Sequence, residues 1–223
     1  MIAVLLLPLV VVVGLLVAIA IYIDSPGPVL FRSIRTGAGG VPFVMLKFRK
    51  MHRDADNVPV TLGDDERFTP IGRFLSATRL DELPQLYNVF QGDMRLVGPR
   101  PELACFVAEF AEQYASILTV APGITGHAQL RFFDEHRLLS GPDPRTAYAE
   151  IVMPEKIRID LDYVRTHSLR GDLAILVRTA ALPFRLFTAT ASASGVSLQW
   201  CFGAAATVGT AIVASVLAAS RLS

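Results

Sequence analysis

The sequence predicts an α/β domain, mostly helical with a few short strands, that lies against a membrane. Hydrophobic residues make up 52% of the 223 residues and charged residues only 18%, and the mean hydropathy is +0.46. An average soluble domain has about 25% charged residues. In the polar middle of the chain, short strand-like runs and longer helical patterns of apolar residues follow one another, which predicts the α/β class.

An uncharged apolar segment opens the chain. Residues 1–23 contain no charged side chain, and about 20 apolar residues are enough to cross a bilayer core. We therefore expect residues 1–24 to form an N-terminal membrane helix. Pro8 and Gly14 can bend such a helix, so both a spanning and a re-entrant helix are open. A cleaved signal peptide is the alternative, but no basic residue precedes the apolar run.

Residues 25–187 are expected to form a single, more polar domain, on the cytoplasmic side of the membrane. Basic residues are frequent between 32 and 53, and such residues next to a membrane segment stay in the cytoplasm. Turn signals and apolar periodicity predict strands at 29–31 and 42–46, a loop at 122–126, and helices at 83–90, 103–118, 153–163 and 173–187. Residues 188–223 form a second apolar segment, either a second membrane helix or an interfacial or poorly ordered tail.

The charge balance and the cysteines exclude several classes of protein. Twenty-one basic and 20 acidic residues leave a net charge of +1, so no general positive excess exists to bind a nucleic acid. Cys105 and Cys201 are too few for a disulfide framework. The four histidines are scattered, which argues against a zinc site.

The pair Asp81-Glu82 is the first candidate site. Pro84 is tolerated only in the first turn of a helix, so the two carboxylates lie at or just before a helix N-terminus. A simple capping role is the alternative. Neighbouring residues on a helix point about 100° apart. One carboxylate can therefore face a substrate while the other acts as a base, a metal ligand or an orienting group.

Arg100 is the second candidate, because Pro99 and Pro101 restrict the backbone on both sides of it. A guanidinium held in this way can bind a phosphate through two hydrogen bonds, and a solvated arginine in a tight turn is the alternative. The stretch Lys-Phe-Arg-Lys-Met at 47–51 adds phosphate-binding charge or, alternatively, a basic flank beside the membrane.

Several motifs occur in an order that resembles a known family. They are Ser-Pro-Gly-Pro at 25–28, Lys-Phe-Arg-Lys-Met at 47–51, Leu-Asp-Glu-Leu-Pro-Gln at 80–85, Gly-Asp-Met at 92–94, Val-Gly-Pro-Arg-Pro at 97–101 and Pro-Gly-Ile-Thr-Gly at 122–126. Together they resemble the bacterial sugar transferases. These are monotopic polyprenyl-phosphate phosphoglycosyl transferases that initiate the assembly of exopolysaccharides, O-antigens and glycoprotein glycans.

The resemblance implies transfer of a sugar-1-phosphate from a nucleotide sugar, with UDP as the default nucleotide, to membrane polyprenyl phosphate. It implies a covalent aspartyl-phosphosugar intermediate and release of a nucleoside monophosphate. Asp81 matches the nucleophile and Glu82 its catalytic partner. Binding of phosphate or substrate falls to Arg100, Lys47, Arg79 and Gln129. The family requires Mg²⁺, for which Asp81 is the first candidate ligand and Glu82 and Asp93 are further candidates.

The resemblance also implies a place in the cell, the bacterial inner (cytoplasmic) membrane. The expected partners are the lipid bilayer, nucleotide sugar and polyprenyl phosphate.

Three features depart from the family pattern. Residues 76–78 lack an arginine that the family often has, which Arg79 could replace. His127 stands where a tryptophan is common, and only seven residues precede Pro8, where a longer first arm is expected.

Two other functions are alternatives to this one. A non-catalytic, membrane-anchored homologue would bind nucleotide sugar or partner proteins without turnover. An ordinary glycosyltransferase would use Asp54-Ala55-Asp56 as its metal motif and release a nucleoside diphosphate. The sequence names neither the sugar nor the oligomeric state.

Overall fold

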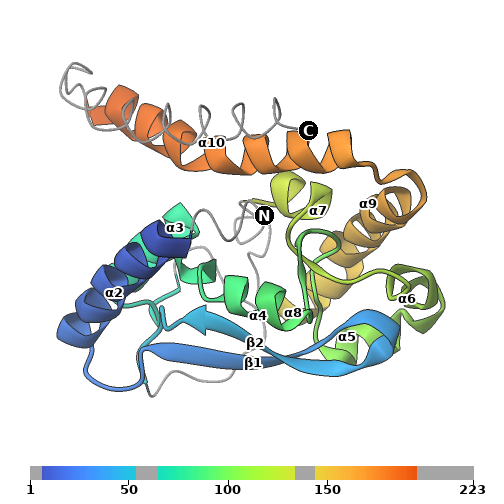
Figure 1. The fold of residues 1–223 in the computed structure, drawn as a ribbon, viewed down its shortest axis with the longest axis horizontal. Helices are drawn as coiled ribbons and strands as arrows, with labels where there is room; N and C mark the ends of the chain where they lie inside the picture. Colours follow the sequence, from blue (N-terminus) through green and yellow to red (C-terminus); the bar gives the residue numbers. More distant parts are fainter. Residues whose placement is uncertain (1–6, 54–64, 134–143, 195–223) are drawn as a thin grey trace.

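The computed structural model describes residues 7–53, 65–133 and 144–194. This part of the chain is mostly helical with a few short strands, as predicted (Figure 1). In chain order the elements are α2 (Leu7–Asp24), β1 (Leu30–Thr36), η1 (Ala38–Gly40), β2 (Pro42–Phe48), α3 (Pro70–Thr78), η2 (Leu80–Glu82), α4 (Gln85–Gln91), β3 (Arg95–Val97), α5 (Ala104–Glu109), α6 (Ala111–Ile117), β4 (Gly123–Thr125), α7 (His127–Arg131), α8 (Pro144–Ala147), η4 (Tyr148–Val152), α9 (Met153–Thr166) and α10 (Leu169–Ser194).

Residues 7–24 of the predicted membrane segment are helical, as α2. Within the described ranges, no helix is both long enough and apolar enough to cross a membrane. The predicted apolar segment at 188–223 lies outside the described residues from position 195 onward. The final helix α10 continues past residue 187 to Ser194.

The strands β1 and β2 form an antiparallel hairpin, as predicted, although both are longer than the sequence pattern indicated. Leu30 pairs with Phe48 at the open end, and Thr36 pairs with Pro42 at the turn. The turn is closed by a 2.8 Å hydrogen bond from the Gly37 N–H to the Val41 carbonyl. The hairpin carries Lys47 near its open end, next to the chain that leads to Lys50.

Helix α2 packs beside α3 and against the end of the hairpin (Figure 1). Val17 and Ile21 of α2 are buried against Phe48 of β2 and Leu75 of α3. At the end of α2, the Asp24 carboxylate accepts a 3.2 Å hydrogen bond from the backbone N–H of Ile71 at the start of α3. The N-terminal segment is therefore part of the same packed unit as the hairpin.

Helix α3 was not predicted, and its position depends on one glycine. The Thr69 hydroxyl caps the helix by accepting a 2.9 Å hydrogen bond from the Gly72 N–H. A Cβ atom on Gly72 would lie 1.8 Å from the carbonyl oxygen of Lys50. Since a backbone carbonyl cannot rotate away as a side chain can, only glycine lets α3 lie on the chain after β2. This contact fixes the backbone of Lys50.

The loop predicted at 122–126 is instead mostly a strand, β4, which pairs in parallel with β3. Arg95 pairs with Gly123 and Val97 with Thr125. A Cβ atom on Gly123 would lie 2.1 Å from the backbone nitrogen of Gly98. The glycine that signals a loop in the sequence here permits the close approach of two backbones, which is the reason for the error.

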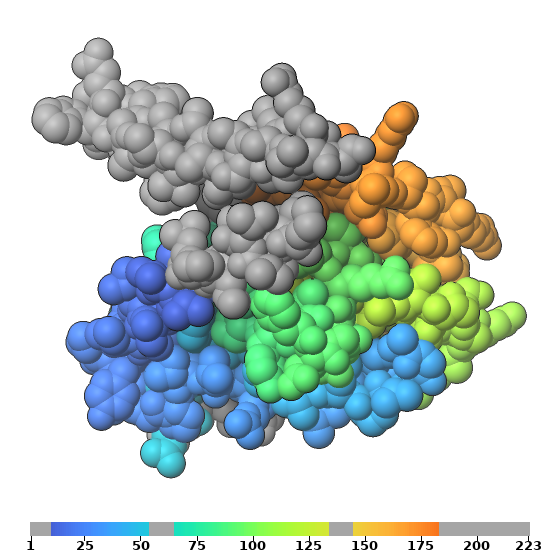
Figure 2. All heavy atoms as spheres, in the orientation of Figure 1, coloured from blue at the N-terminus to red at the C-terminus, as the bar shows by residue number. Residues whose placement is uncertain are grey.

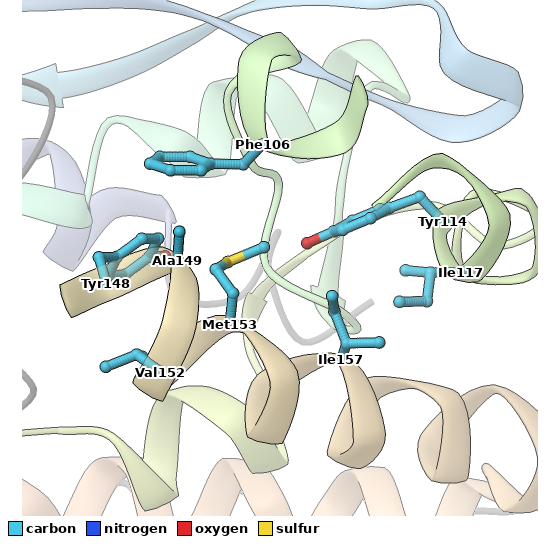
Figure 3. Close-up of a cluster of buried hydrophobic side chains, with 8 residues drawn as sticks. All are labelled: Phe106, Tyr114, Ile117, Tyr148, Ala149, Val152, Met153 and Ile157. Carbon is cyan, nitrogen blue, oxygen red and sulfur yellow. The ribbon is translucent and has the colours of Figure 1, made fainter. Parts of the chain in front are cut away.

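A hydrophobic core fills the space between α5, α6, η4 and α9 (Figure 3). Its buried members are Phe106, Tyr114, Ile117, Tyr148, Ala149, Val152, Met153 and Ile157. The single helix predicted at 103–118 is wrong, because the backbone leaves helical geometry at Phe110 (φ −116°, ψ 39°) and separates α5 from α6. The amphipathic helix predicted at 153–163 is confirmed as α9.

Helix α10 crosses the molecule above α7 and the β3–β4 pair (Figure 1). Its Ile175 is 1% exposed and packs with Val97 of β3 and Tyr163 of α9. The Tyr163 hydroxyl donates a 2.9 Å hydrogen bond to Asp172 at the start of α10. These contacts join the C-terminal helices to the sheet that precedes the Arg100 loop.

Candidate functional site

Arg79 ends α3 and begins the turn that carries Asp81 and Glu82. The backbone of Arg79 is in the left-handed region (φ 60°, ψ 14°). In the described part of the chain, Arg79 is the only residue other than glycine with a positive φ. Such a conformation costs about 1–2 kcal/mol for a residue with a Cβ atom, and strain of this kind is frequent at functional sites. The 3-10 turn η2 follows, and α4 begins after Pro84. The two carboxylates thus lie just before a helix, as predicted.

Glu82 is buried among basic side chains from three other parts of the chain. Both terminal nitrogens of Arg100 donate to Glu82 Oε1, at 3.2 and 3.1 Å. Lys47 Nζ and an Arg79 nitrogen each lie 3.6 Å from the same oxygen. Burial alone would raise the pKa of Glu82, but the positive charges of Arg100, Lys47 and Arg79 outweigh it and hold the pKa well below its ordinary value.

Lys47 is the most deeply buried of these basic groups, with 11% of its side chain exposed. Burial and, next, the charge of Arg100 lower the pKa of Lys47 to about 7, although Glu82 acts in the opposite direction. Its ammonium group therefore gains or loses its proton near neutral pH.

Asp81 is 2% exposed and is only partly neutralised. Its Oδ2 lies 3.6 Å from Lys50 Nζ, whereas its Oδ1 is buried and has no hydrogen-bond partner. The residue at the N-cap position of α4 is Pro84, so the capping role considered for Asp81 does not explain its burial. A buried carboxylate oxygen without a donor is unusual and requires an explanation.

Basic side chains outnumber the two carboxylates at Asp81 and Glu82. Among the described residues, four basic side chains lie within ion-pair distance of the two carboxylates: Lys47, Lys50, Arg79 and Arg100. The positive excess suits a substrate that carries phosphate groups. Arg100 is 19% exposed at its side chain, so it is not the solvated turn residue that was its alternative.

Arg79 also connects the pair to the end of α7. One guanidinium nitrogen donates a 2.9 Å hydrogen bond to the Phe133 carbonyl, and the group lies 4.8 Å from the centre of the Phe133 ring. Residues 76–78 carry no arginine, and Arg79 is the first guanidinium that follows them in the chain. It reaches Glu82 at 3.6 Å.

The structure brings Lys47, Arg79 and Arg100 to the carboxylate pair but leaves two other predicted residues apart from it. Asp93 accepts a 3.1 Å hydrogen bond from the Asn88 amide. Gln129 donates a 3.5 Å hydrogen bond to the Gly98 carbonyl. Neither forms a hydrogen bond or ion pair with Asp81 or Glu82 among the contacts of the described residues.

The chemistry of the carboxylates decides which of them suits Mg²⁺. Magnesium is bound in many phosphate-transferring sites by one or two carboxylates together with substrate phosphates. The Asp81 carboxylate, which has a single ion-pair partner, fits this use. Glu82 does not, because its charge is already compensated by three cations. No cluster of three or more histidine, cysteine or acidic side chains occurs within the described ranges. The Asp54-Ala55-Asp56 motif lies outside them.

Asn88 joins α4 to β2, a role that the sequence reasoning missed. Its amide oxygen accepts a 3.0 Å hydrogen bond from the Leu46 N–H, and its amide nitrogen donates one of 2.8 Å to the Val44 carbonyl. Lys47 is the next residue on β2. Asn88 therefore sets the position of the strand that delivers Lys47 to Glu82, and its place in the Leu-Pro-Gln-Leu-Tyr-Asn run was the available signal.

Lys50 was also missed as a site residue, although it belongs to the basic stretch at 47–51. It follows β2, beyond the alternation of the strand, so the sequence pattern did not indicate which way it points. The Gly72 contact fixes its backbone, and its Nζ also lies 3.4 Å from the Ser76 hydroxyl.

Comparison with known proteins gives this arrangement a context. The sequence profile of the family described as bacterial sugar transferase matches residues 1–185. A protein of Caulobacter vibrioides named UDP-glucose:undecaprenyl-phosphate glucose-1-phosphate transferase is 44% identical over 170 residues, which cover 74% of this chain and 60% of that protein.

Two further relatives carry different names. A UDP-N-acetylgalactosamine-undecaprenyl-phosphate N-acetylgalactosaminephosphotransferase of Aeromonas hydrophila is 35% identical over 182 residues, which cover 79% of this chain and 40% of that protein. An exopolysaccharide production protein PSS of Rhizobium leguminosarum bv. phaseoli is 38% identical over 174 residues, covering 74% and 82%. The chain spans 31–60% of the length of five relatives named as glucose phosphate transferases.

Proposed function

The chain belongs to the bacterial sugar transferase family, and from this premise we propose that it transfers a sugar-1-phosphate from a nucleotide sugar to polyprenyl phosphate. The observation that carries the proposal is the buried Asp81 carboxylate, whose Oδ1 lacks a partner although basic groups surround the pair. A carboxylate oxygen without a partner, in a site rich in positive charge, is suited to attack a phosphorus atom.

The reaction proceeds in two displacements. In the first, Asp81 Oδ1 attacks the phosphorus next to the sugar and forms an acyl phosphate. The bond between this phosphorus and the oxygen bridging to the second phosphorus breaks, and the nucleoside monophosphate leaves with that oxygen. In the second, an oxygen of polyprenyl phosphate attacks the same phosphorus, and the bond to Asp81 breaks. The products are a polyprenyl diphosphate sugar and the regenerated carboxylate.

The other charged residues stabilise and position the reacting groups. Glu82 stays ionised because its pKa is well below its ordinary value. It therefore holds Arg100, Arg79 and Lys47 in place rather than donating a proton. These cations stabilise the charge that accumulates on the phosphate oxygens. Magnesium, held by Asp81 and substrate phosphates, would supply further neutralisation of that charge.

An apolar groove, lined in part by the residues that follow the pair in the chain, supports a lipid-linked acceptor. The groove has a volume of ≈ 270 Å³, and its lining includes Leu83, Pro84 and Tyr87 together with Val10, Phe48 and Phe90. Leu83 and Pro84 directly follow the carboxylate pair in the chain. A hydrocarbon chain bound there would bring its phosphate group toward Asp81.

We place the protein at the bacterial inner membrane, with the site on the cytoplasmic face, and exposed apolar side chains support contact of the protein with a membrane. Leu15, Leu16 and Ile19 of α2 are more than half exposed, and Phe31 and Ile34 of β1 are at least half exposed. In Figure 2, α2 and the hairpin form one edge of the molecule. Large exposed apolar areas are typical of surfaces that contact a membrane or another protein.

Incubation of the purified protein with undecaprenyl phosphate, Mg²⁺ and a panel of nucleotide sugars tests the proposal. We expect release of a nucleoside monophosphate that depends on the lipid. The panel must include UDP-glucose and UDP-N-acetylgalactosamine, since relatives of this chain are named for each. Release of a diphosphate would favour an ordinary glycosyltransferase. Absence of turnover with every sugar would favour the non-catalytic homologue.

A further inference from the structure

One face of the stretch from η2 to α4 is buried and is directed toward β2. Asp81, Glu82, Gln85 and Asn88 are each between 1% and 8% exposed. Spacings of three and four residues place side chains on the same face of a helix. Both η2 and α4 contact β2. The four polar residues therefore form a single buried row that begins at the proposed nucleophile.

Gln85 differs from the other members of this row. Asp81 pairs with Lys50, Glu82 pairs with Arg100, and Asn88 bonds to the backbone of β2. Gln85 is 1% exposed, and its amide nitrogen Nε2 is buried without any hydrogen-bond partner. A buried donor without an acceptor destabilises a folded protein. Such groups are rare in native structures and require a specific explanation.

The neighbourhood of Gln85 indicates what the missing acceptor is. One helical turn before it, Asp81 Oδ1 is also buried without a partner. The row thus holds a free nucleophilic oxygen and a free N–H donor four residues apart. The adjacent cations Lys47 and Arg100 favour an anion over a neutral group. A phosphate group there would offer an acceptor oxygen to the Gln85 N–H, and its phosphorus would lie next to Asp81 Oδ1, which attacks it in the proposed function.

We propose that Gln85 is a substrate-binding residue whose side-chain amide donates a hydrogen bond to a phosphate oxygen of the reacting substrate, an inference that rests on the proposed function. The phosphate belongs to the nucleotide sugar or to polyprenyl phosphate. In either case the bond supplies the acceptor that the buried donor lacks and orients the phosphate for attack by Asp81.

The variant Gln85→Met tests the inference, because methionine has nearly the same length and volume but no amide. Loss of a hydrogen bond to a charged oxygen predicts a kcat/KM about 10- to 100-fold lower than in the wild type. The thermal midpoint of unfolding should be equal to or above that of the wild type, since the substitution removes a donor that has no partner. A residue with a purely structural role would show a lower midpoint.

Asn88→Leu is the matched control on the same helix face. This variant removes an amide that has partners, so the Leu46 N–H and the Val44 carbonyl each lose a hydrogen bond. The midpoint of unfolding of Asn88→Leu should therefore fall.

Titration of each substrate separately identifies the source of the phosphate. A raised KM for the nucleotide sugar assigns the bond to the donor substrate, and a raised KM for polyprenyl phosphate assigns it to the acceptor. Lower kcat with both KM values unchanged places the bond in the transition state.

The outcomes separate the inference from the proposed function. An active wild type together with unaltered kinetics of Gln85→Met overturns the inference alone. A lower midpoint of unfolding for Gln85→Met also overturns it, because the amide then has a structural partner. A wild-type protein that is inactive with every nucleotide sugar overturns the proposed function and the inference with it.

Discussion

At the scale of single residues, Asp81 and Glu82 differ in environment although they are neighbours in the chain. Glu82 is compensated by Arg100, Lys47 and Arg79, while Asp81 has one ion-pair partner, Lys50, and one oxygen without a donor. This difference assigns them different tasks. Asp81 is suited to react, and Glu82 to hold the cations that stabilise the reaction.

Asp81→Asn should abolish turnover and leave the fold intact. An amide has nearly the same shape as the carboxylate but is a far poorer nucleophile. We expect release of nucleoside monophosphate to fall by at least about 10³-fold. The midpoint of unfolding should stay within about 2 °C of the wild type, because only a partly exposed ion pair is lost. Asp162→Asn, on the exposed face of α9, is the control and should retain full activity. Substantial turnover by Asp81→Asn would exclude Asp81 as the nucleophile.

Arg100→Lys should lower kcat/KM strongly, although both side chains are basic. Arg100 contacts Glu82 Oε1 through two nitrogens, whereas lysine offers a single ammonium group. The expected loss is about 1.5–3 kcal/mol of transition-state stabilisation, the range for hydrogen bonds to charged groups. Steady-state kinetics measures it as a decrease in kcat/KM. Arg158→Lys, at an exposed position, is the control for replacing arginine by lysine and should leave activity unchanged. Wild-type kinetics of Arg100→Lys would show that Arg100 has only a structural role.

The pH dependence of activity should report Lys47. Its pKa is lowered from the ordinary value of 10.5 to about 7, so the ammonium form predominates below that pH and is lost above it. Glu82 stays ionised throughout this range, because its pKa is lowered. If the charge of Lys47 binds substrate phosphate, kcat/KM falls as the pH rises through about 7. Lys47→Arg keeps its charge at every pH tested and should flatten this part of the profile. An identical profile in both proteins would assign the change to another group.

At the scale of elements, the site depends on how α3 and α4 meet the strand β2. Asn88 bonds α4 to the strand immediately before Lys47, and Gly72 lets α3 contact the backbone of Lys50. Two basic residues three positions apart are thereby directed toward Glu82 and Asp81 respectively. The hairpin thus supplies charge to the site, while α2 on its other side faces outward.

Gly72→Ala should weaken both the fold and the site. The added Cβ would lie 1.8 Å from the Lys50 carbonyl oxygen, and overpacking of this kind costs about 1–3 kcal/mol. Thermal unfolding should show a lower midpoint, and kcat/KM should fall because Lys50 is displaced. Gly14→Ala in α2 is the matched control. Its Cβ would lie 3.8 Å from the Phe48 ring, an ordinary contact, so no loss of stability is expected. Equal stability of both variants would contradict the close packing of α3.

At the scale of the whole molecule, α2 and the hairpin share an apolar groove with the residues that follow the carboxylate pair in the chain. Gly14 and Phe48 contribute to the groove lining, and Leu30 lies at its edge in β1. Exposed residues of α2 continue outward from these positions. A lipid surface against this edge could deliver a polyprenyl phosphate to the site without passing it through water.

Replacement of Leu15, Leu16 and Ile19 together by serine should weaken binding to phospholipid vesicles. These side chains are 57–64% exposed, so the change removes apolar area that a membrane would cover, at about 25 cal/mol per Å². Co-sedimentation of the whole chain with vesicles containing anionic lipid should fall by at least about 10-fold. Ile151→Ser, at a position of similar exposure in η4, is the control and should bind as the wild type does. Undiminished binding by the triple variant would contradict a membrane role for α2.

The features that were predicted correctly from sequence depend on contacts between near neighbours. The hairpin follows from two apolar runs around a glycine-rich turn, the start of α4 from Pro84, and α9 from its amphipathic spacing. Two of the errors arose where a glycine allows a close backbone contact, and a third, the single helix predicted at 103–118, arose at Phe110. Gly123 and Gly72 allow close backbone contacts with distant parts of the chain, so β4 was taken for a loop and α3 was not predicted.

The order of the motifs, the mostly helical character and the place of Asp81 and Glu82 before a helix can all be read from the sequence, because they are properties of composition and local spacing. Which charges meet depends on the packing of the folded chain. Lys47 and Arg100 reach Glu82 from β2 and from the loop after β3, and Asp81 and Gln85 are left with unpartnered polar atoms. Contacts of this kind depend on how separate elements pack, and the spacing of residues along the chain contains no direct record of that packing.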